Sequence, residues 1–272
     1  MSLLLPLLFL WGLTAPVESN LNPQKLQYIW TYISNTYPKM MNRNKAMYAV
    51  ALYIPNDDCN GDIDLQRILT GNDNNKKDKL GSEGGMYIGD RLMIARPSEN
   101  TEHAEHRLLD QLKEKGWDTN SCVVFFVKDS PCTEKCLNEQ KNNDNILELL
   151  ETFKKWATGK KAFLFQDIFY QDLGYSNNKN PEYIPPPPKT RSQLLSAFRR
   201  IEKHVPLYRC NAYTQNGCIR CVNDEISLND NECLYEIAKE TESSRAGSKR
   251  RHGQSSTNNP NERSRKILKK GV

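Results

Sequence analysis

The chain has 272 residues, of which 38% are hydrophobic and 26% charged, and its formal net charge is +5. This length provides one large domain or two small ones, with ample material for a core. Residues 241–272 carry nine lysines and arginines against two glutamates, so this segment holds a charge of +7 and the residues before it about −2. The basic balance is therefore a property of the C-terminal segment, and it excludes a strongly basic folded body.

The first 19 residues contain an apolar run, Leu3 to Leu13, followed by small residues and a V-x-S cleavage site that ends at Ser19. The run is shorter than the roughly 20 residues that cross a bilayer, so we expect a signal peptide, with an uncleaved anchor as the alternative. No later segment has the length and apolar content of a transmembrane helix. We therefore expect a soluble secreted protein.

Helix and strand patterns follow this leader. Asn22-Pro23 begins an amphipathic helix that ends near Pro38, and apolar runs at 46–54 and 86–95 predict two strands, separated by a polar loop. The next five elements alternate helix and strand, beginning with a helix: residues 101–115, 123–127, 146–157, 162–169 and 190–203. A short polyproline spacer, Pro185 to Pro188, precedes the last of them. This order predicts a three-layer α/β/α sandwich.

Two short stretches carry specific chemistry. They read T-E-H-A-E at 101–105 and S-P-C-T-E-K-C at 130–136. A catalytic zinc ion takes three protein ligands and keeps a fourth position for water, and His103, Cys132 and Cys136 supply one nitrogen and two thiolates. We expect the cysteines on one face of a helix that begins at Pro131. Glu105 is the expected proton carrier.

The alternative for these residues is a surface helix with a chance histidine and two cysteines joined in a disulfide. The next histidine, His106, is expected to pack rather than to bind metal. The arrangement H-x-E followed by P-C-x-x-C, here with one extra residue between the cysteines, is the pattern of the zinc deaminases.

The stretch from about Met47 to Tyr175 resembles the AID/APOBEC-like branch of the cytidine-deaminase superfamily. With the leader, the chain is most similar to the secreted AID/APOBEC-like deaminases of animals, which are regarded as immune proteins. The resemblance implies a cytidine-deaminase-type sandwich around a central mixed five-stranded sheet, a zinc cofactor and cytosine as the base. Polynucleotide deaminases usually carry S-W-S before the P-C, and only Ser130 of that triplet is present here.

The resemblance also implies two places that contact substrate. One is the segment before the first strand, where Asn42 or Asn44 corresponds to the asparagine of the loop that touches the sugar of the substrate. The loop after the fourth predicted strand corresponds to the segment that reads the flanking base, and its aromatic residues are Phe169, Tyr170 and Tyr175. The alternative for these three rings is core or loop packing.

Six further cysteines in a secreted chain predict disulfides: Cys59, Cys122, Cys210, Cys218, Cys221 and Cys233. The last four lie within 24 residues, so we expect a stapled segment that bridges mostly within itself, although the sequence leaves the pairing open. A second, structural zinc on those four is the alternative, because Cys218 and Cys221 have metal-ligand spacing. Cys122 opens a buried strand, and a simple core thiol is the alternative for it.

We divide the chain into a signal peptide (1–19), a deaminase-like domain (20–205), a cysteine-rich extension of that domain (206–240) and a disordered basic tail (241–272). The tail either attracts polyanions or is a solvated end, and its K-R-R triplet resembles a nuclear signal that the leader argues against. The leading hypothesis is a secreted zinc-dependent cytidine deaminase acting on single-stranded nucleic acid or a related nucleoside. The alternatives are a zinc-containing immune or binding protein without catalysis and a free-nucleoside or nucleotide cytidine deaminase. Glu105 favours an enzyme, because a structural zinc site has no use for it.

Overall fold

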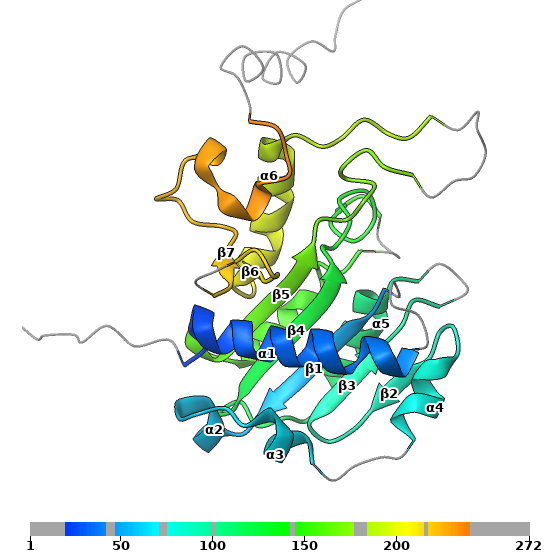
Figure 1. Ribbon diagram of the computed structural model, residues 1–272, viewed down its shortest axis with the longest axis vertical. Coiled ribbons are helices and arrows are strands. Elements are labelled where there is room, and N and C mark those ends of the chain that lie inside the picture. Colours follow the sequence, from blue (N-terminus) through cyan, green and yellow to red (C-terminus); the bar gives the residue numbers. More distant parts are fainter. Residues whose placement is uncertain are drawn as a thin grey trace, which may run out of the picture. The chain divides into compact units, whose positions relative to one another are not determined.

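A mixed sheet of seven strands forms the centre of the computed structural model (Figure 1). The strand order is β2-β3-β1-β4-β5-β6-β7. β4 pairs in parallel with β5, β5 pairs in parallel with β6, and the other neighbours are antiparallel. The strands are β1 (Ala49–Ile54), β2 (Met86–Ile88), β3 (Leu92–Ala95), β4 (Cys122–Asp129), β5 (Lys161–Asp167), β6 (Leu207–Arg209) and β7 (Ile219–Arg220).

The structure describes residues 20–41, 47–70, 75–98, 102–141, 145–176, 184–214 and 217–239. The predicted leader, the predicted basic tail, and Asn42 and Asn44 lie outside these residues. Within them, no helix combines the length and apolar content needed to cross a membrane. The α-helices are α1 (Pro23–Thr36), α2 (Asn56–Asn60), α3 (Leu65–Leu69), α4 (Lys76–Gly81), α5 (Ala104–Glu114) and α6 (Arg191–Glu202), and short 3-10 helices lie at Pro38–Met41, Leu149–Lys155, Thr158–Lys160, Leu228–Asp230 and Glu232–Leu234.

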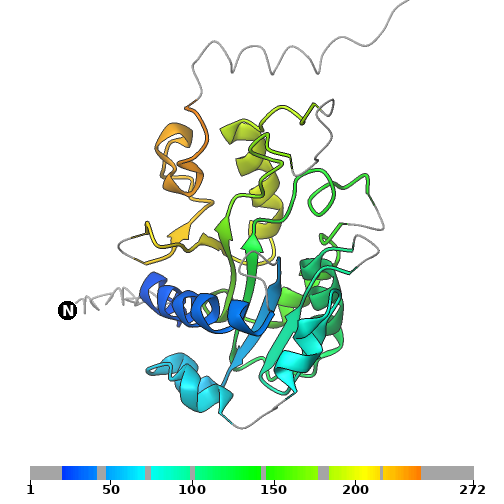
Figure 2. The ribbon, with the colours of Figure 1, turned by 45° about the vertical axis from the view of Figure 1, so that its right-hand side comes forward.

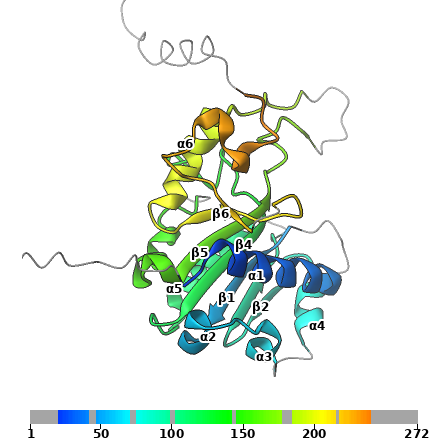
Figure 3. The same cartoon turned by 60° about the vertical axis from the view of Figure 1, so that its left-hand side comes forward.

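Side chains of the central strands alternate between two cores, one on each face of the sheet. In β4, Val123 and Phe125 belong to the core that also holds the buried residues of α5 and α6. Val124 and Phe126 belong to the core beneath α1. Figure 1 shows α1 lying across the strands, and the turned views in Figure 2 and Figure 3 place α1 and α5 on different sides of them. The predicted three layers are therefore present.

The number of strands differs from the expected five. The apolar run at 86–95 forms two strands, because the chain turns between them and the Gly89 N–H donates to the carbonyl of Leu92 at 2.8 Å. β6 and β7 come from the cysteine-rich segment, where no strand was predicted. They add to the sheet beyond β5 and make it seven strands wide.

The helix expected at 146–157 is a 3-10 helix, Leu149–Lys155. Its buried side chains Leu150 and Phe153 and the buried C-cap residue Trp156 recur every three residues, which is the period of a 3-10 turn. Phe153 meets Phe125 of β4 edge to face, with ring centroids 6.1 Å apart. The segment therefore packs on the sheet at the expected place with a tighter backbone.

Three disulfides join the six cysteines outside the motif. They are Cys59–Cys122, Cys210–Cys218 and Cys221–Cys233. The cysteines at 210–233 bridge within their own segment as predicted, so the alternative of a second, structural zinc is wrong. The alternative of a core thiol is wrong for Cys122, because that residue ties β4 to α2.

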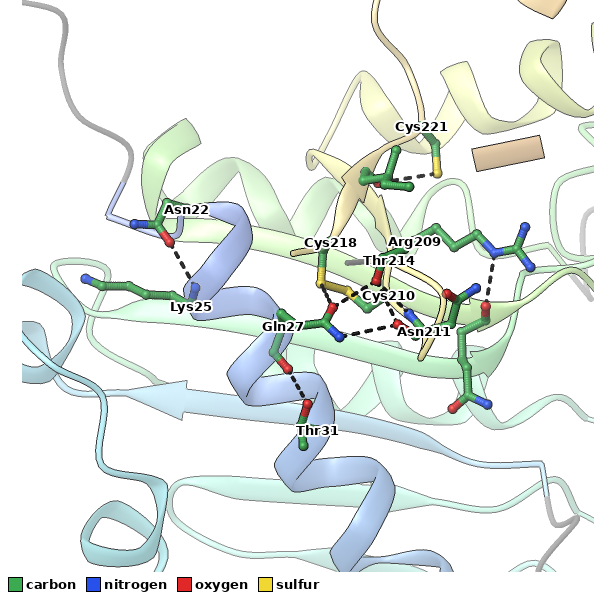
Figure 4. Close-up of a disulfide and its surroundings, with 12 residues drawn as sticks. Asn22, Lys25, Gln27, Thr31, Arg209, Cys210, Asn211, Thr214, Cys218 and Cys221 are labelled. Carbon is green, nitrogen blue, oxygen red and sulfur yellow. Dashed lines mark hydrogen bonds between the residues drawn. A yellow bond between two sulfur atoms is a disulfide. The ribbon is translucent and has the colours of Figure 1, made fainter. Parts of the chain in front are cut away.

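The cysteine-rich segment is also fastened to α1 and to the sheet by buried polar contacts. Figure 4 shows Gln27 of α1 beside the Cys210–Cys218 disulfide, where its amide contacts the carbonyl of Asn211 at 3.3 Å and the hydroxyl of Thr214 at 3.1 Å. Arg209, fully buried in β6, donates to the carbonyl of Cys233 at 2.8 Å.

Arg191, at the start of α6, makes the densest of these contacts. Its guanidinium donates to four backbone carbonyls of the cysteine-rich segment, at 2.8 to 3.3 Å: Ile237, Leu228, Asn229 and Asn231. The side chain of Arg191 is only 3% exposed. A cation among four carbonyl oxygens fixes a segment that has little regular structure of its own.

Candidate metal centre and active site

The parallel pairing of β4 and β5 decides where the motif lies. The carboxyl ends of both strands meet at one edge of the sheet, which is the usual place for a ligand site in such sheets. Ser130, directly after β4, ties the two following loops together. Its N–H donates to the carbonyl of Asp167 at 2.7 Å, and its buried hydroxyl accepts the N–H of Phe169 at 3.0 Å.

Residues 133–137 form turns and Cys132 directly precedes them, so the predicted helix from Pro131 is not formed. The Leu137 N–H donates to the carbonyl of Cys132 at 3.1 Å, five residues back, which is wider than an α-helical turn. Thr133 explains the departure. Its N–H and its hydroxyl both donate to the carboxylate of Asp172, at 3.2 and 2.6 Å, so a contact with a distant loop shapes this backbone.

The turns nevertheless bring the three motif ligands together. His103 is the N-cap residue of α5, and its Nδ1 lies 3.0 Å from Sγ of Cys136 and 3.8 Å from Sγ of Cys132. The two sulfurs are 3.4 Å apart and are not joined in a disulfide. Ligands around one tetrahedral zinc ion are separated by about 3.5 to 3.8 Å, as follows from the usual zinc–ligand distances. The three distances therefore fit zinc to within about half an ångström.

Glu105 is the second residue of α5 and is buried against this cluster. Its Oε1 lies 3.0 Å from Sγ of Cys136 and 3.5 Å from Nδ1 of His103. Burial acts to raise the pKa of Glu105, but the hydrogen bonds with His103 and Cys136 outweigh it, so its pKa is lowered. The carboxylate is therefore charged at neutral pH and stands beside the ligands.

The protein groups of the cluster attract a cation. Hydrogen bonds with Cys132 and Glu105 raise the pKa of His103 to about 10, against the opposite effect of burial. The hydrogen bond with Cys136 lowers the pKa of the Cys132 thiol to about 5, whereas that contact and burial raise the pKa of Cys136. A thiolate and a carboxylate thus hold the imidazole in its protonated form, and a metal ion binds such a site by displacing protons.

A cavity of about 500 Å³ extends from this cluster. Phe169 and Tyr170 line it, with ring centroids 4.7 Å apart, and the Phe169 ring is 6.5 Å from the ring of His103. Tyr175 is 66% exposed and is not among the lining residues. His106 contacts Glu102 at 2.9 Å, outside the ligand cluster.

Comparison with known families decides what kind of protein carries this site. The sequence model of the family described as Secreted Novel AID/APOBEC-like Deaminase 1 matches residues 24–237. The chain belongs to this AID/APOBEC-like deaminase family. It matches no curated protein and no solved structure.

The outer wall of the deaminase cavity contains residues that the sequence did not single out. Asp172 receives both bonds from Thr133, and its carbonyl accepts the Lys189 N–H at 2.7 Å. The side chain of Lys189 forms an ion pair with Glu134, which lies between the two cysteines. The motif turns, the loop after β5 and the segment before α6 are therefore joined around one cavity.

The proline spacer is part of this wall. Pro186 lines the cavity, and Pro188 packs against Gly174 so closely that a Cβ at Gly174 would lie 3.0 Å from the Pro188 ring. Gly174 also has a positive φ of 82°, which favours glycine. The D-L-G sequence at 172–174 is the signal that could have indicated a tight, functional turn here.

Proposed function

We propose that this chain is a secreted zinc-dependent hydrolytic deaminase, which converts cytosine to uracil in single-stranded nucleic acid or a related nucleoside. The observation that carries the proposal is the position of Glu105. It is a buried, charged carboxylate 3.0 Å from a metal-ligand sulfur, beside a cavity with two aromatic rings. A site that bound zinc only for stability would not need a carboxylate there.

The residues of the chain divide the reaction between them. Zinc, when bound by His103, Cys132 and Cys136, lowers the pKa of a water to about 7. Glu105 accepts one proton from the water at Oε1 and delivers it to the ring nitrogen of cytosine, then accepts the second proton of that water and delivers it to the departing amine. Water and cytosine are consumed, and uracil and ammonia are released. The rings of Phe169 and Tyr170 supply a stacking surface for the base.

One of the two lysines that line the cavity favours a substrate that carries phosphate. Lys189 is paired with Glu134, whereas Lys135 lines the cavity and is half-buried. A free nucleoside offers no anion for Lys135, but a nucleotide or a nucleic acid strand does. This favours nucleic acid or nucleotides over free nucleosides, although the S-W-S tryptophan is missing.

Secretion is supported by two observations. The family description contains the word secreted, and three disulfides join cysteines that are buried in the fold. Disulfides of this kind form and persist in oxidising compartments. The predicted signal peptide, the basic tail as a polyanion binder and an immune role stay predictions.

The test is to incubate zinc-loaded protein with cytidine, deoxycytidine, their 5′-monophosphates, and single-stranded DNA and RNA, and to measure uracil and ammonia. Glu105→Gln should reduce the rate about 100- to 10,000-fold. It should leave one zinc per chain by elemental analysis. Glu102→Gln, one turn away and paired with His106, is the matched control and should retain activity.

Each result has a definite reading. Equal activity of Glu105→Gln and the unsubstituted chain would reject the role of Glu105. A protein that contains zinc and binds nucleic acid but releases no ammonia from any substrate would favour the binding protein without catalysis.

A further inference from the structure

A second cavity lies on the other face of the sheet, beneath α1. It has a volume of about 360 Å³, at the lower end of the range for sites that bind small molecules. Its lining combines α1, the segment after it, the residue before β1 and the ends of β4 and β5: Trp30, Ser34, Asn35, Pro38, Lys39, Tyr48, Lys128 and Gln166. Figure 1 shows α1 lying across these strands. None of the residues that line this second cavity is one of the candidate metal ligands His103, Cys132 and Cys136.

The strand alternation places this cavity and the catalytic cavity at the same edge of the sheet. Lys128 and Gln166 are neighbours on β4 and β5, because the residues on either side of them are paired in register. Lys128 donates its N–H to the carbonyl of Tyr48 at 3.1 Å. Met47 lines the catalytic cavity and Tyr48 lines the second one, so consecutive residues face the two sites from opposite sides of the sheet.

The chemistry of the second cavity selects an anion attached to a hydrogen-bonding group. Lys39 and Lys128 contribute two positive charges, and no lining residue is acidic. The indole Nε1 of Trp30 is buried and has no hydrogen-bond partner among the described residues. A buried donor without an acceptor is unfavourable, so a ligand that supplies an acceptor is stabilised there. The amide of Asn35 adds donors and an acceptor, and the amide of Gln166, whose Nε2 already donates to Asp167 at 3.1 Å, adds its carbonyl oxygen and its second N–H.

We propose that this cavity binds a phosphorylated nucleoside. The lysines contact its phosphate, and the Trp30 N–H and the amides contact its base or sugar. The choice of a nucleotide over another anion rests on the proposed function of the neighbouring site. The same chemistry is present in a free nucleotide and in a nucleotide of the strand whose cytosine occupies the catalytic cavity.

The experiment reads the Trp30 indole directly in a ¹H–¹⁵N spectrum of the secreted chain. Trp30→Phe identifies its resonance. Trp117 and Trp156 serve as internal controls, because their indole N–H groups already donate to the carbonyls of Asp90 and Asp118. The probes are thymidine 5′-monophosphate, thymidine, inorganic phosphate and a single-stranded DNA of five thymidines. Thymine has no amine to lose, so the result does not depend on turnover.

We expect thymidine 5′-monophosphate or the thymidine oligomer to move the Trp30 resonance downfield and to leave the other two in place. A shift with the mononucleotide indicates a free nucleotide site, and a shift with the oligomer alone indicates a site for a neighbouring nucleotide. The proposal would be overturned if inorganic phosphate were the only probe to shift the Trp30 resonance, or if none of the probes shifted it.

Variants separate this proposal from the function on which it rests. Lys39→Gln and Lys128→Gln should each weaken the binding measured by the Trp30 shift about tenfold, the effect of losing one charge-assisted contact. Lys113→Gln, an exposed lysine of α5, should leave it unchanged. Glu105→Gln should abolish deamination and retain the Trp30 shift. If deamination fails in every assay while Trp30 still responds, only the proposed function is lost; if deamination succeeds and Trp30 is silent, only this proposal is lost.

Discussion

Replacing Arg191 by methionine tests whether the cysteine-rich segment is an integral part of the folded body. Methionine keeps the unbranched apolar stem and removes the guanidinium. The Arg191 guanidinium donates to four backbone carbonyls; its bonds to Ile237 and Asn231 are buried, and those to Leu228 and Asn229 are partly buried. A hydrogen bond to a charged group contributes about 1.5 to 3 kcal/mol, and a buried carbonyl left without a donor adds to the loss.

Counting the two buried bonds in full and discounting the others, we expect Arg191→Met to lower the free energy of unfolding by about 3 to 5 kcal/mol. This is a large share of the roughly 5 to 15 kcal/mol that stabilises a typical domain. The midpoint of thermal unfolding should fall by about 6 to 20 °C, at about 2 to 4 °C per kcal/mol for a chain of this size.

The assay is urea unfolding without reductant, so that the Cys221–Cys233 disulfide stays closed. Arg199→Met is the matched control, because Arg199 lies on the same helix, its side chain is half exposed, and its guanidinium pairs with the exposed carboxylate of Asp224 at 3.3 Å. A surface pair of this kind contributes at most about 1 kcal/mol. Equal losses for the two variants, or a loss below 1 kcal/mol for Arg191→Met, would refute the reasoning.

Three further predictions follow from the site and its surroundings. Burial raises the pKa of Asp129 to about 6, so this carboxyl stabilises the fold in acid and its contribution is lost as the pH rises through about 6. Asp129→Asn should therefore gain about 1 to 2 kcal/mol at pH 7 and nothing at pH 3, after a discount for solvent screening, and urea titrations at both pH values measure this. Zinc affinity should rise with pH because His103, whose pKa is raised to about 10, must lose its proton to bind; competition with a chelator at pH 6, 7 and 8 checks the trend, and a flat or falling affinity contradicts it. Gly174→Ala should destabilise the fold by about 1 to 2 kcal/mol and weaken substrate binding, because its added Cβ meets Pro188 at positive φ, whereas Gly116→Ala, with open space around it, should do neither.

The parts of the fold that were predictable from the sequence are those whose patterns are local. Thr190 caps α6 through a capping box, and Asn22 caps α1. β4 is a continuous apolar run in the sequence because successive side chains enter the two cores on opposite faces of the sheet. The sequence also singled out His103, Cys132 and Cys136, whose side chains the structure brings together, because their spacing matches a known metal-ligand pattern.

The parts that were not predictable depend on contacts between distant residues. The helix expected to begin at Pro131 is replaced by turns. The N–H and the hydroxyl of Thr133 donate instead to the carboxylate of Asp172, 39 residues further along the chain. β6 and β7 have three and two residues, which is too short for a period to be visible in the sequence. The wall that Pro186 and Lys189 add to the cavity comes from a segment whose composition indicated only a spacer.

The bonds between Thr133 and Asp172 have a consequence for how this protein can change. The Asp172 carboxylate accepts two bonds from Thr133, the residue after Cys132, and the backbone carbonyl of Asp172 accepts the N–H of Lys189. In the proposed enzyme, metal retention and substrate preference are therefore coupled, so exchanging this loop to alter substrate preference should weaken metal binding unless Asp172 is kept. Conversely, stripping the ion should loosen the substrate wall before it unfolds the sheet.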